Sequence, residues 1–123
     1  MRTELIIPEH VPSVNGKGGM HRSHWSKKGT IIKKYIYLFR SQTNNQHQGR
    51  IKMIVTRMSL NPRMDYDNLV ACYKHHIDAI VKAGIIKDDS PKIIVPKPIY
   101  EQVQALDKSQ QRTVIIIEDM PWT

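Results

Sequence analysis

The chain of 123 residues has a single cysteine, Cys72, so it cannot close an internal disulfide, which fits a reducing compartment. No apolar run approaches the ~20 residues that a membrane-spanning helix needs. The first ten residues, MRTELIIPEH, lack the apolar core of a signal peptide. These absences predict a cytoplasmic protein with no membrane partner.

Acidic residues are missing from one long stretch of the chain. Between Glu9 and Asp65 there is none, while eleven Lys and Arg residues fall there, and the formal net charge of the chain is +8. Such a surface repels itself unless a polyanion supplies counter-charge, and nucleic acid is the usual one because binding releases its condensed cations. The alternative is a basic protein without this partner. The cations expected to contact DNA are Lys17, Arg22, Lys27, Lys28, Lys33 and Arg63.

Length and composition indicate one globular domain over residues 1–123, with 40% hydrophobic and 24% charged residues. Hydrophobic periodicity and the positions of proline and glycine predict its elements. In order, we expect a strand at 3–7, a basic amphipathic helix from Ser23 or Ser26 to 42, a strand at 50–60, a helix from Asp65 or Asp67 to Gly84, a strand near 92–95 and a last strand at 111–119. This order predicts an α+β fold, a small mixed sheet packed against two main helices.

Both helices carry an apolar stripe at helical spacing, which predicts their contribution to the core. His76 lies on the second stripe, so we expect a packed histidine there rather than a metal ligand. The stripes comprise Ile31, Ile32, Tyr35, Leu38 and Phe39 in the first helix, and Leu69, Cys72, Tyr73, His76, Ile77, Ile80 and Val81 in the second.

Five of the eleven acidic residues crowd into one short span, at Asp65, Asp67, Asp78, Asp88 and Asp89. Asp67, Lys74 and Asp78 fall within roughly 40° of one another on a helix and share a face. Carboxylates held close together repel each other unless a cation lies among them, and Mg²⁺ is a hard ion that prefers oxygen ligands. The span therefore indicates a metal site for phosphodiester hydrolysis. Helix caps, a solvated helix face and a turn would explain the same residues separately.

Three segments in this region, "DYDN", "KHHIDAIVKAG" and "DDS", resemble the RusA family of Holliday junction resolvases. The resemblance covers residues 63–91, with a further "PSVN" near the N-terminus. Carried over by position, it implies essential carboxylates at Asp65, Asp67 and Asp89 and an active-site lysine at Lys74. Asp78 and Asp88 become possible supporting metal ligands.

The lysine departs from the family pattern. The family's lysine comes four residues after the second Asp of its motif, where this chain has Ala71. Lys74 comes seven residues after that Asp, which implies a helix three residues longer. Because these positions lie on nearly one helix face, the ammonium group is still expected to reach the site.

The resemblance implies a homodimer with two active sites that makes paired, symmetric, Mg²⁺-dependent nicks in a four-way DNA junction during recombination and repair. Mn²⁺ is a possible substitute for Mg²⁺, and a phage or prophage origin would fit the family. A two-fold dimer suits a junction of near two-fold symmetry. Two alternatives remain, a basic DNA-binding module without catalysis and a less selective metal nuclease acting on branched DNA or RNA.

Overall fold

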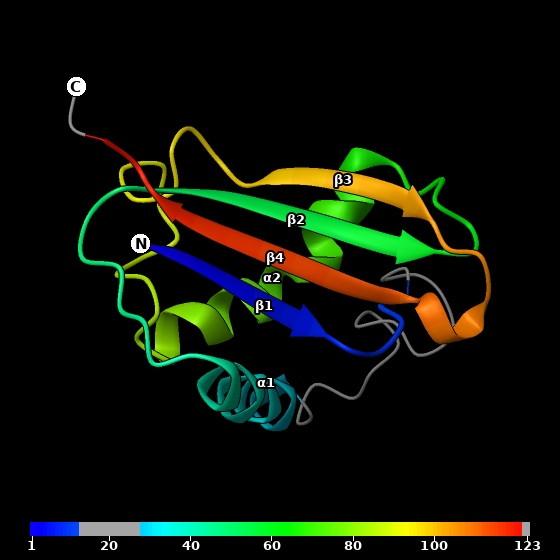
Figure 1. Ribbon diagram of the computed structural model, residues 1–123, viewed down its shortest axis with the longest axis horizontal. Helices are drawn as coiled ribbons and strands as arrows, with labels where there is room; N and C mark the ends of the chain where they lie inside the picture. Colours follow the sequence, from blue (N-terminus) through cyan, green and yellow to red (C-terminus); the bar gives the residue numbers. More distant parts are fainter. Residues whose placement is uncertain (13–27, 122–123) are drawn as a thin grey trace.

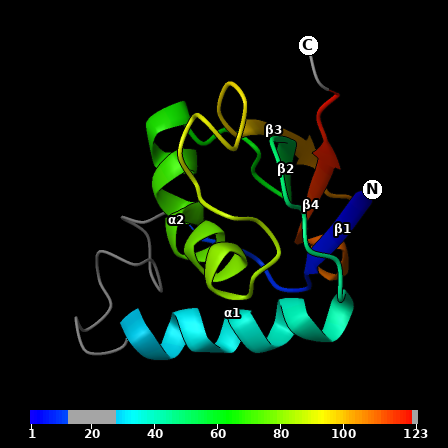
Figure 2. The ribbon, with the colours of Figure 1, turned by 90° about the vertical axis from the view of Figure 1, so that its left-hand side faces the viewer.

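A computed structural model of the chain describes residues 1–12 and 28–121. These residues form a four-stranded sheet with two helices packed on one of its faces (Figures 1 and 2). The elements follow the predicted order of strand, helix, strand, helix, strand and strand, with a short 3-10 helix before the last strand. The predicted α+β architecture with a mixed sheet and two helices is confirmed.

The sheet is centred on its last strand. The strand order is β1-β4-β2-β3, where β1 spans Arg2–Ile7, β2 spans Ile51–Ser59 and β4 spans Arg112–Asp119. β4 pairs antiparallel with β1 on one side and with β2 on the other. In the apolar run "TVIII", Thr113, Ile115 and Ile117 face the helices and are buried, whereas Val114 and Ile116 lie on the opposite face and are half-buried.

The third strand is not where the sequence predicts it. β3 spans Ile99–Gln104 and pairs in parallel with β2, whereas residues 92–95 form only an isolated bridge in which Ile94 pairs with Ile51. Pro96 has no backbone N–H, so a ladder begun at this bridge cannot continue through it. The prediction of a strand at 92–95 is therefore wrong, and parallel pairing resumes five residues later, after the prolines.

Helix α1 spans Lys28–Gln42 and contributes the predicted stripe to the core. Ile32, Tyr35 and Phe39 are buried. The rings of Tyr35 and Phe39 are stacked with their centroids 6.0 Å apart. The predicted start of the helix at Ser23 or Ser26 lies outside the described residues.

Helix α2 spans Tyr66–Lys82, and both of its ends match local signals in the sequence. Asp65 is the N-cap, and its side chain accepts a hydrogen bond from the backbone N–H of Asn68. Gly84 follows the C-cap residue Ala83 with φ of 80°, a left-handed conformation that favours glycine. The predicted stripe is confirmed: six of its members, Leu69, Cys72, Tyr73, His76, Ile77 and Ile80, are buried.

The face of the sheet opposite the helices is covered by no described element (Figure 2). Among its residues, Ile6, Ile99 and Val103 are exposed. Within the described part of the chain, no helix is both long enough and apolar enough to cross a bilayer.

Candidate metal and nucleic-acid site

The first two aspartates of the predicted site lie at the start of α2. Asp65 Oδ1 accepts the capping hydrogen bond at 2.8 Å, and Asp67 lies in the first turn. Both side chains belong to exposed residues. A carboxylate has about four lone-pair sites, so the cap leaves most of the acceptor capacity of Asp65 available. Two carboxylates two residues apart at one exposed helix end suit Mg²⁺, which takes one or two carboxylates and completes its shell with water and phosphate oxygens.

Lys74 and Asp78 lie further along the same helix. Lys74 is exposed and Asp78 is half-buried. At 1.5 Å per residue, Lys74 lies about 10 Å beyond Asp67 along the helix axis. The helix therefore presents a cation two turns from the carboxylates.

The segment that follows α2, which carries Asp88 and Asp89, lies beyond the opposite end of the helix (Figure 1). A helix over Tyr66–Lys82 is about 25 Å long at 1.5 Å per residue. The pair is exposed, and the Asp88 side chain accepts a hydrogen bond from the backbone N–H of Asp89 at 2.8 Å.

Backbone and side-chain hydrogen bonds tie the segments before and after α2 to opposite ends of β2. The backbone N–H of Ile93 donates to Ser90, next to the aspartate pair, and its carbonyl accepts from Ile51 at the start of β2. At the other end, Met64 exchanges two hydrogen bonds with Gln102, which pairs with Arg57 near the end of β2. At about 3.3 Å per residue, these two points on β2 are about 20 Å apart.

The predicted convergence of Asp89 with Asp65 and Asp67 is therefore not seen within one chain. No group of three or more His, Cys, Asp or Glu side chains in the described ranges is arranged to hold a metal ion. Asp65 and Asp67 lie together at one end of α2, and Asp88 and Asp89 lie together at the other.

A cavity of about 340 Å³ opens beside the start of α2. It shares Asn68 with the Asp65 cap, because Asn68 lines the cavity and donates its backbone N–H to that carboxylate. Among residues 1–12 and 28–121, its lining contains no acid and consists of His10, Arg57, Ser59, Leu60, Asn61, Arg63, Met64, Asn68 and Gln111. A positively charged cavity thus adjoins the aspartates.

Arg57 is the buried cation of this cavity, with a relative exposure of 4%. Its Nε and Nη2 donate to the carbonyl oxygen of Val11 at 3.1 and 2.9 Å, and Nη1 lies 3.5 Å from the carbonyl oxygen of Asn61. Arg57 is not among the six cations that the sequence predicts to contact DNA. The alternation of β2 could have found it, because Arg57 shares the buried parity of Ile51, Met53 and Val55.

Two of the six cations predicted to contact DNA can be placed with their side chains. Lys33 is exposed on α1, and Arg63 is exposed at the cavity. Lys28 is the first residue of α1. Lys17, Arg22 and Lys27 lie outside the described residues, as does most of the "PSVN" segment.

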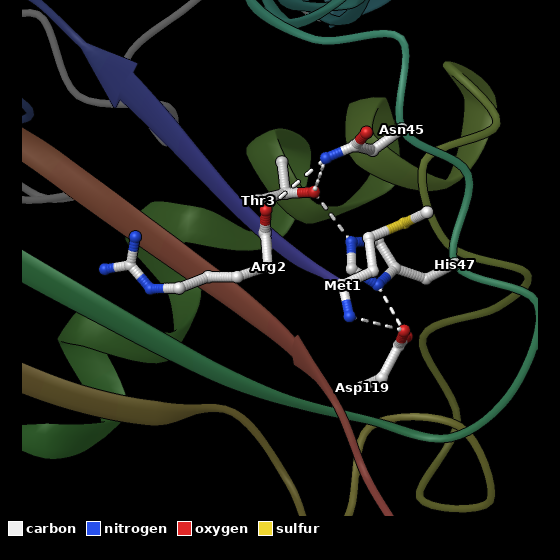
Figure 3. A network of polar contacts seen from close by, with 6 residues as sticks. All are labelled: Met1, Arg2, Thr3, Asn45, His47 and Asp119. Atoms are coloured by element: carbon white, nitrogen blue, oxygen red, sulfur yellow. Dashed lines mark hydrogen bonds and ion pairs between the residues drawn. The ribbon is translucent and has the colours of Figure 1, made fainter.

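A second polar cluster lies at the other end of the sheet, where the first and last strands meet (Figure 3). His47 bridges two strands: its Nδ1 is 2.7 Å from Asp119 Oδ1, and its Nε2 is 2.7 Å from Thr3 Oγ1. Asn45 Nδ2 donates to the same threonine oxygen at 3.0 Å, and the Met1 ammonium group is 3.2 Å from Asp119.

The carboxylate, imidazole and hydroxyl of this cluster follow the order of a hydrolytic triad, but the hydroxyl is enclosed. Thr3 and His47 each have a relative exposure of 2%. A nucleophile must reach its substrate, so this burial favours a structural role. The cluster ties the loop before β2 to the two strands.

Comparison with known proteins adds no family: a scan against protein-family models matched none, and a search of curated proteins found no significant match. The fold and the site geometry therefore carry the functional argument.

Proposed function

We propose that this protein is a Mg²⁺-dependent endodeoxyribonuclease that resolves four-way DNA junctions, as its resemblance to the RusA family implies. One observation carries the proposal: two exposed carboxylates at the start of α2 adjoin a cavity lined by two arginines and a histidine and, in the described part of the chain, by no acid. Metal-binding carboxylates beside a phosphate-attracting surface are what phosphodiester hydrolysis requires. A cytoplasmic setting is part of the proposal and agrees with the single buried cysteine.

Asp65 and Asp67 are the ligands that we assign to the metal. When bound, Mg²⁺ would polarise a phosphoryl oxygen and lower the pKa of a bound water molecule. Lys74 would hold a phosphate oxygen or offset negative charge that develops during hydrolysis. Arg63 and Lys33 would contact backbone phosphates, which position a protein on DNA without reading its sequence.

Asp89 can join this site only from a second copy of the chain, because it lies beyond the far end of its own α2. In a two-fold dimer, an antiparallel arrangement brings the far end of one helix toward the start of the partner's. Two such sites would face opposed strands of a junction, which itself has near two-fold symmetry. We therefore assign Asp89, with Asp88 in support, to a shared site in a homodimer. Asp78 remains a supporting candidate within the helix.

Cleavage of a labelled mobile junction tests the reaction. We expect two symmetric nicks in the presence of Mg²⁺ and none without it. Asp67→Asn should abolish cleavage and retain junction binding, while the matched variant Glu118→Gln, exposed on β4, should cut at the wild-type rate. A protein that binds the junction and never cuts it would be a DNA-binding module. Equal cleavage of junction and plain duplex at one salt concentration would identify a less selective nuclease.

Mixed dimers test whether the site is shared. Asp67→Asn and Asp89→Asn should each be inactive alone. A heterodimer of the two would contain one intact site, built from the unchanged Asp67 of one chain and the unchanged Asp89 of the other, and should nick one strand of each junction. If Asp89 acted within its own chain, every site of the heterodimer would carry a substitution and the mixture would stay inactive.

A further inference from the structure

The buried position of Arg57 is the starting point. Residues of β2 with odd numbers face the helices, and the neighbours of Arg57 on that face, Val55 and Ser59, have relative exposures of 0% and 2%. Arg57 pairs across the sheet with Thr113 on β4 and Gln102 on β3. The strand therefore carries a guanidinium group into the interior at the end nearest the start of α2.

No anion within the described ranges neutralises this group. Its three hydrogen-bond contacts go to two backbone carbonyl oxygens, and no carboxylate of the described residues lies within 4.0 Å of it. Removing a cation from water is costly unless a counter-charge accompanies it. Two carbonyl dipoles reduce that cost without supplying a negative charge.

Arg57 lines the cavity together with Arg63 and His10. Among the described residues, no acid lines it. Its volume of about 340 Å³ falls in the range of small-ligand sites. Asn68, in the first turn of α2, lines the wall, so the positive end of the helix dipole also favours an anion there.

We infer that this cavity binds a phosphate group, with the Arg57 guanidinium as its buried anchor and Arg63 at its entrance. The Nε and Nη2 edge of this guanidinium already donates to Val11, so the phosphate would be held through the other edge, by Nη1 and the second N–H of Nη2. In assigning the phosphate to a DNA strand, the inference rests on the proposed function. The cavity wall adjoins Asp65 through Asn68, so the bound phosphate would lie near the proposed metal ligands.

Titration of the whole chain with inorganic phosphate, followed by amide NMR in metal-free buffer, tests the cavity itself. We expect saturable shifts at the Arg57 Nε–H group and at the backbone amides of Asn61 and Asn68. The Arg57→Lys variant keeps a charge without the fork and should weaken binding about ten-fold. Shifts that do not saturate, or that spread equally over the exposed cations, would overturn the inference and leave only general attraction to a basic surface.

Junction binding without Mg²⁺ tests the source of the phosphate. Arg63→Gln should weaken binding about ten-fold and reduce the slope of log affinity against log salt by about one phosphate contact. Arg112→Gln removes the same charge from the uncovered face of the sheet and should leave both values unchanged. Arg57→Gln should behave as Arg63→Gln does, with far-UV circular dichroism as the folding check. If it fails to fold, Arg57→Lys and Arg63→Gln decide the result.

These outcomes separate the inference from the proposed function. Phosphate that saturates the cavity of a protein that never cuts DNA would support the inference and contradict the nuclease. If the protein cuts junctions, and Arg63→Gln binds them as tightly as the wild type does, the nuclease would be supported and the inference contradicted. A third outcome is that inorganic phosphate saturates the cavity while all three cavity variants bind the junction as the wild type does. That result would reject DNA as the source of the phosphate and assign the cavity to a small phosphate compound.

Discussion

The Asp119 carboxylate at the end of β4 lies 2.7 Å from Nδ1 of His47, a histidine buried between two strands (Figure 3). An ionised carboxylate can only accept, so Nδ1 donates to it, and in the neutral ring Nε2 then accepts from Thr3 Oγ1. A single ring thereby joins the loop before β2 to the start of β1 and to the end of β4, which lie side by side. The hydrogen bond from His47, with the Met1 ammonium group nearby, lowers the pKa of Asp119 below its ordinary value of 3.8.

Asp119→Asn removes the charge that faces His47 and should lower the free energy of unfolding at pH 7. The loss should be only about 1 kcal/mol, because water screens the exposed carboxylate. A lowered carboxyl pKa contributes stability that is present above pH 3.8 and is lost as pH falls through the folded-state pKa. Urea unfolding at pH 7 and pH 2.5 measures the difference between variant and wild type. We expect it to shrink at the lower pH, and a difference that stayed constant would contradict the role assigned to the charge.

His76, buried on α2, gives the free energy of unfolding a second dependence on pH. Burial lowers its pKa from 6.5 to about 4, against weaker opposing effects of the Cys72 carbonyl and Glu9. The unfolded chain therefore takes up a proton below pH 6.5 that the folded chain refuses until about pH 4. Stability attributable to this ring is complete above pH 6.5, falls through that window and levels off below it.

The expected loss across the window is between about 3 and 4 kcal/mol, at about 1.4 kcal/mol for each unit of pKa. Replacing His76 by Leu, which cannot titrate, should flatten the dependence of unfolding free energy on pH between 6.5 and 4. NMR titration of the wild-type ring should place its midpoint near pH 4. A midpoint near 6.5 would show that the ring is solvated and would remove the basis of this prediction.

Tyr73 connects α2 to the central strand. Its hydroxyl group is 2.6 Å from Thr113 Oγ1, and both residues have a relative exposure of 0%. Tyr73→Phe keeps the ring packing and leaves the threonine hydroxyl buried without this partner, so it should cost about 1–3 kcal/mol in urea unfolding. Tyr37→Phe, on an exposed part of α1, is the matched control and should change stability by less than about 0.5 kcal/mol.

Local signals made α2 predictable, and long-range pairing made the third strand unpredictable. The Asp65 side chain caps the backbone three residues along, and Gly84 adopts the left-handed conformation itself, so the sequence around them contains the information. The apolar segment at 92–95 has the composition of a strand, but Pro96 stops its ladder, and the real strand at 99–104 is an edge strand with a weaker pattern.

The same distinction explains the candidate site. The grouping of Asp65 with Asp67 is local and was predicted, while the placement of Asp89 depends on the pairing of β3. Because β3 runs parallel to β2, the chain must return to the start of β2 before β3 begins, and α2 makes this crossing. Residues just after the helix therefore lie far from those just before it. The spacing of the aspartates alone does not show whether the strands before and after the helix pair in parallel.

Asp65 has two roles in our account, a helix cap and a metal ligand, and two substitutions separate them. Asn caps a helix about as well as Asp and lacks the charge, so Asp65→Asn should unfold within about 0.5 kcal/mol of wild type and lose Mg²⁺-dependent cleavage. Asp65→Ala should lose cleavage and also about 1 kcal/mol of stability, because the N–H of Asn68 loses its acceptor. Urea unfolding and junction cleavage are measured on the same preparations. An Asp65→Asn variant that cleaves at the wild-type rate would leave Asp65 with the cap alone, and the proposed metal site would lose one of its two ligands at the start of α2.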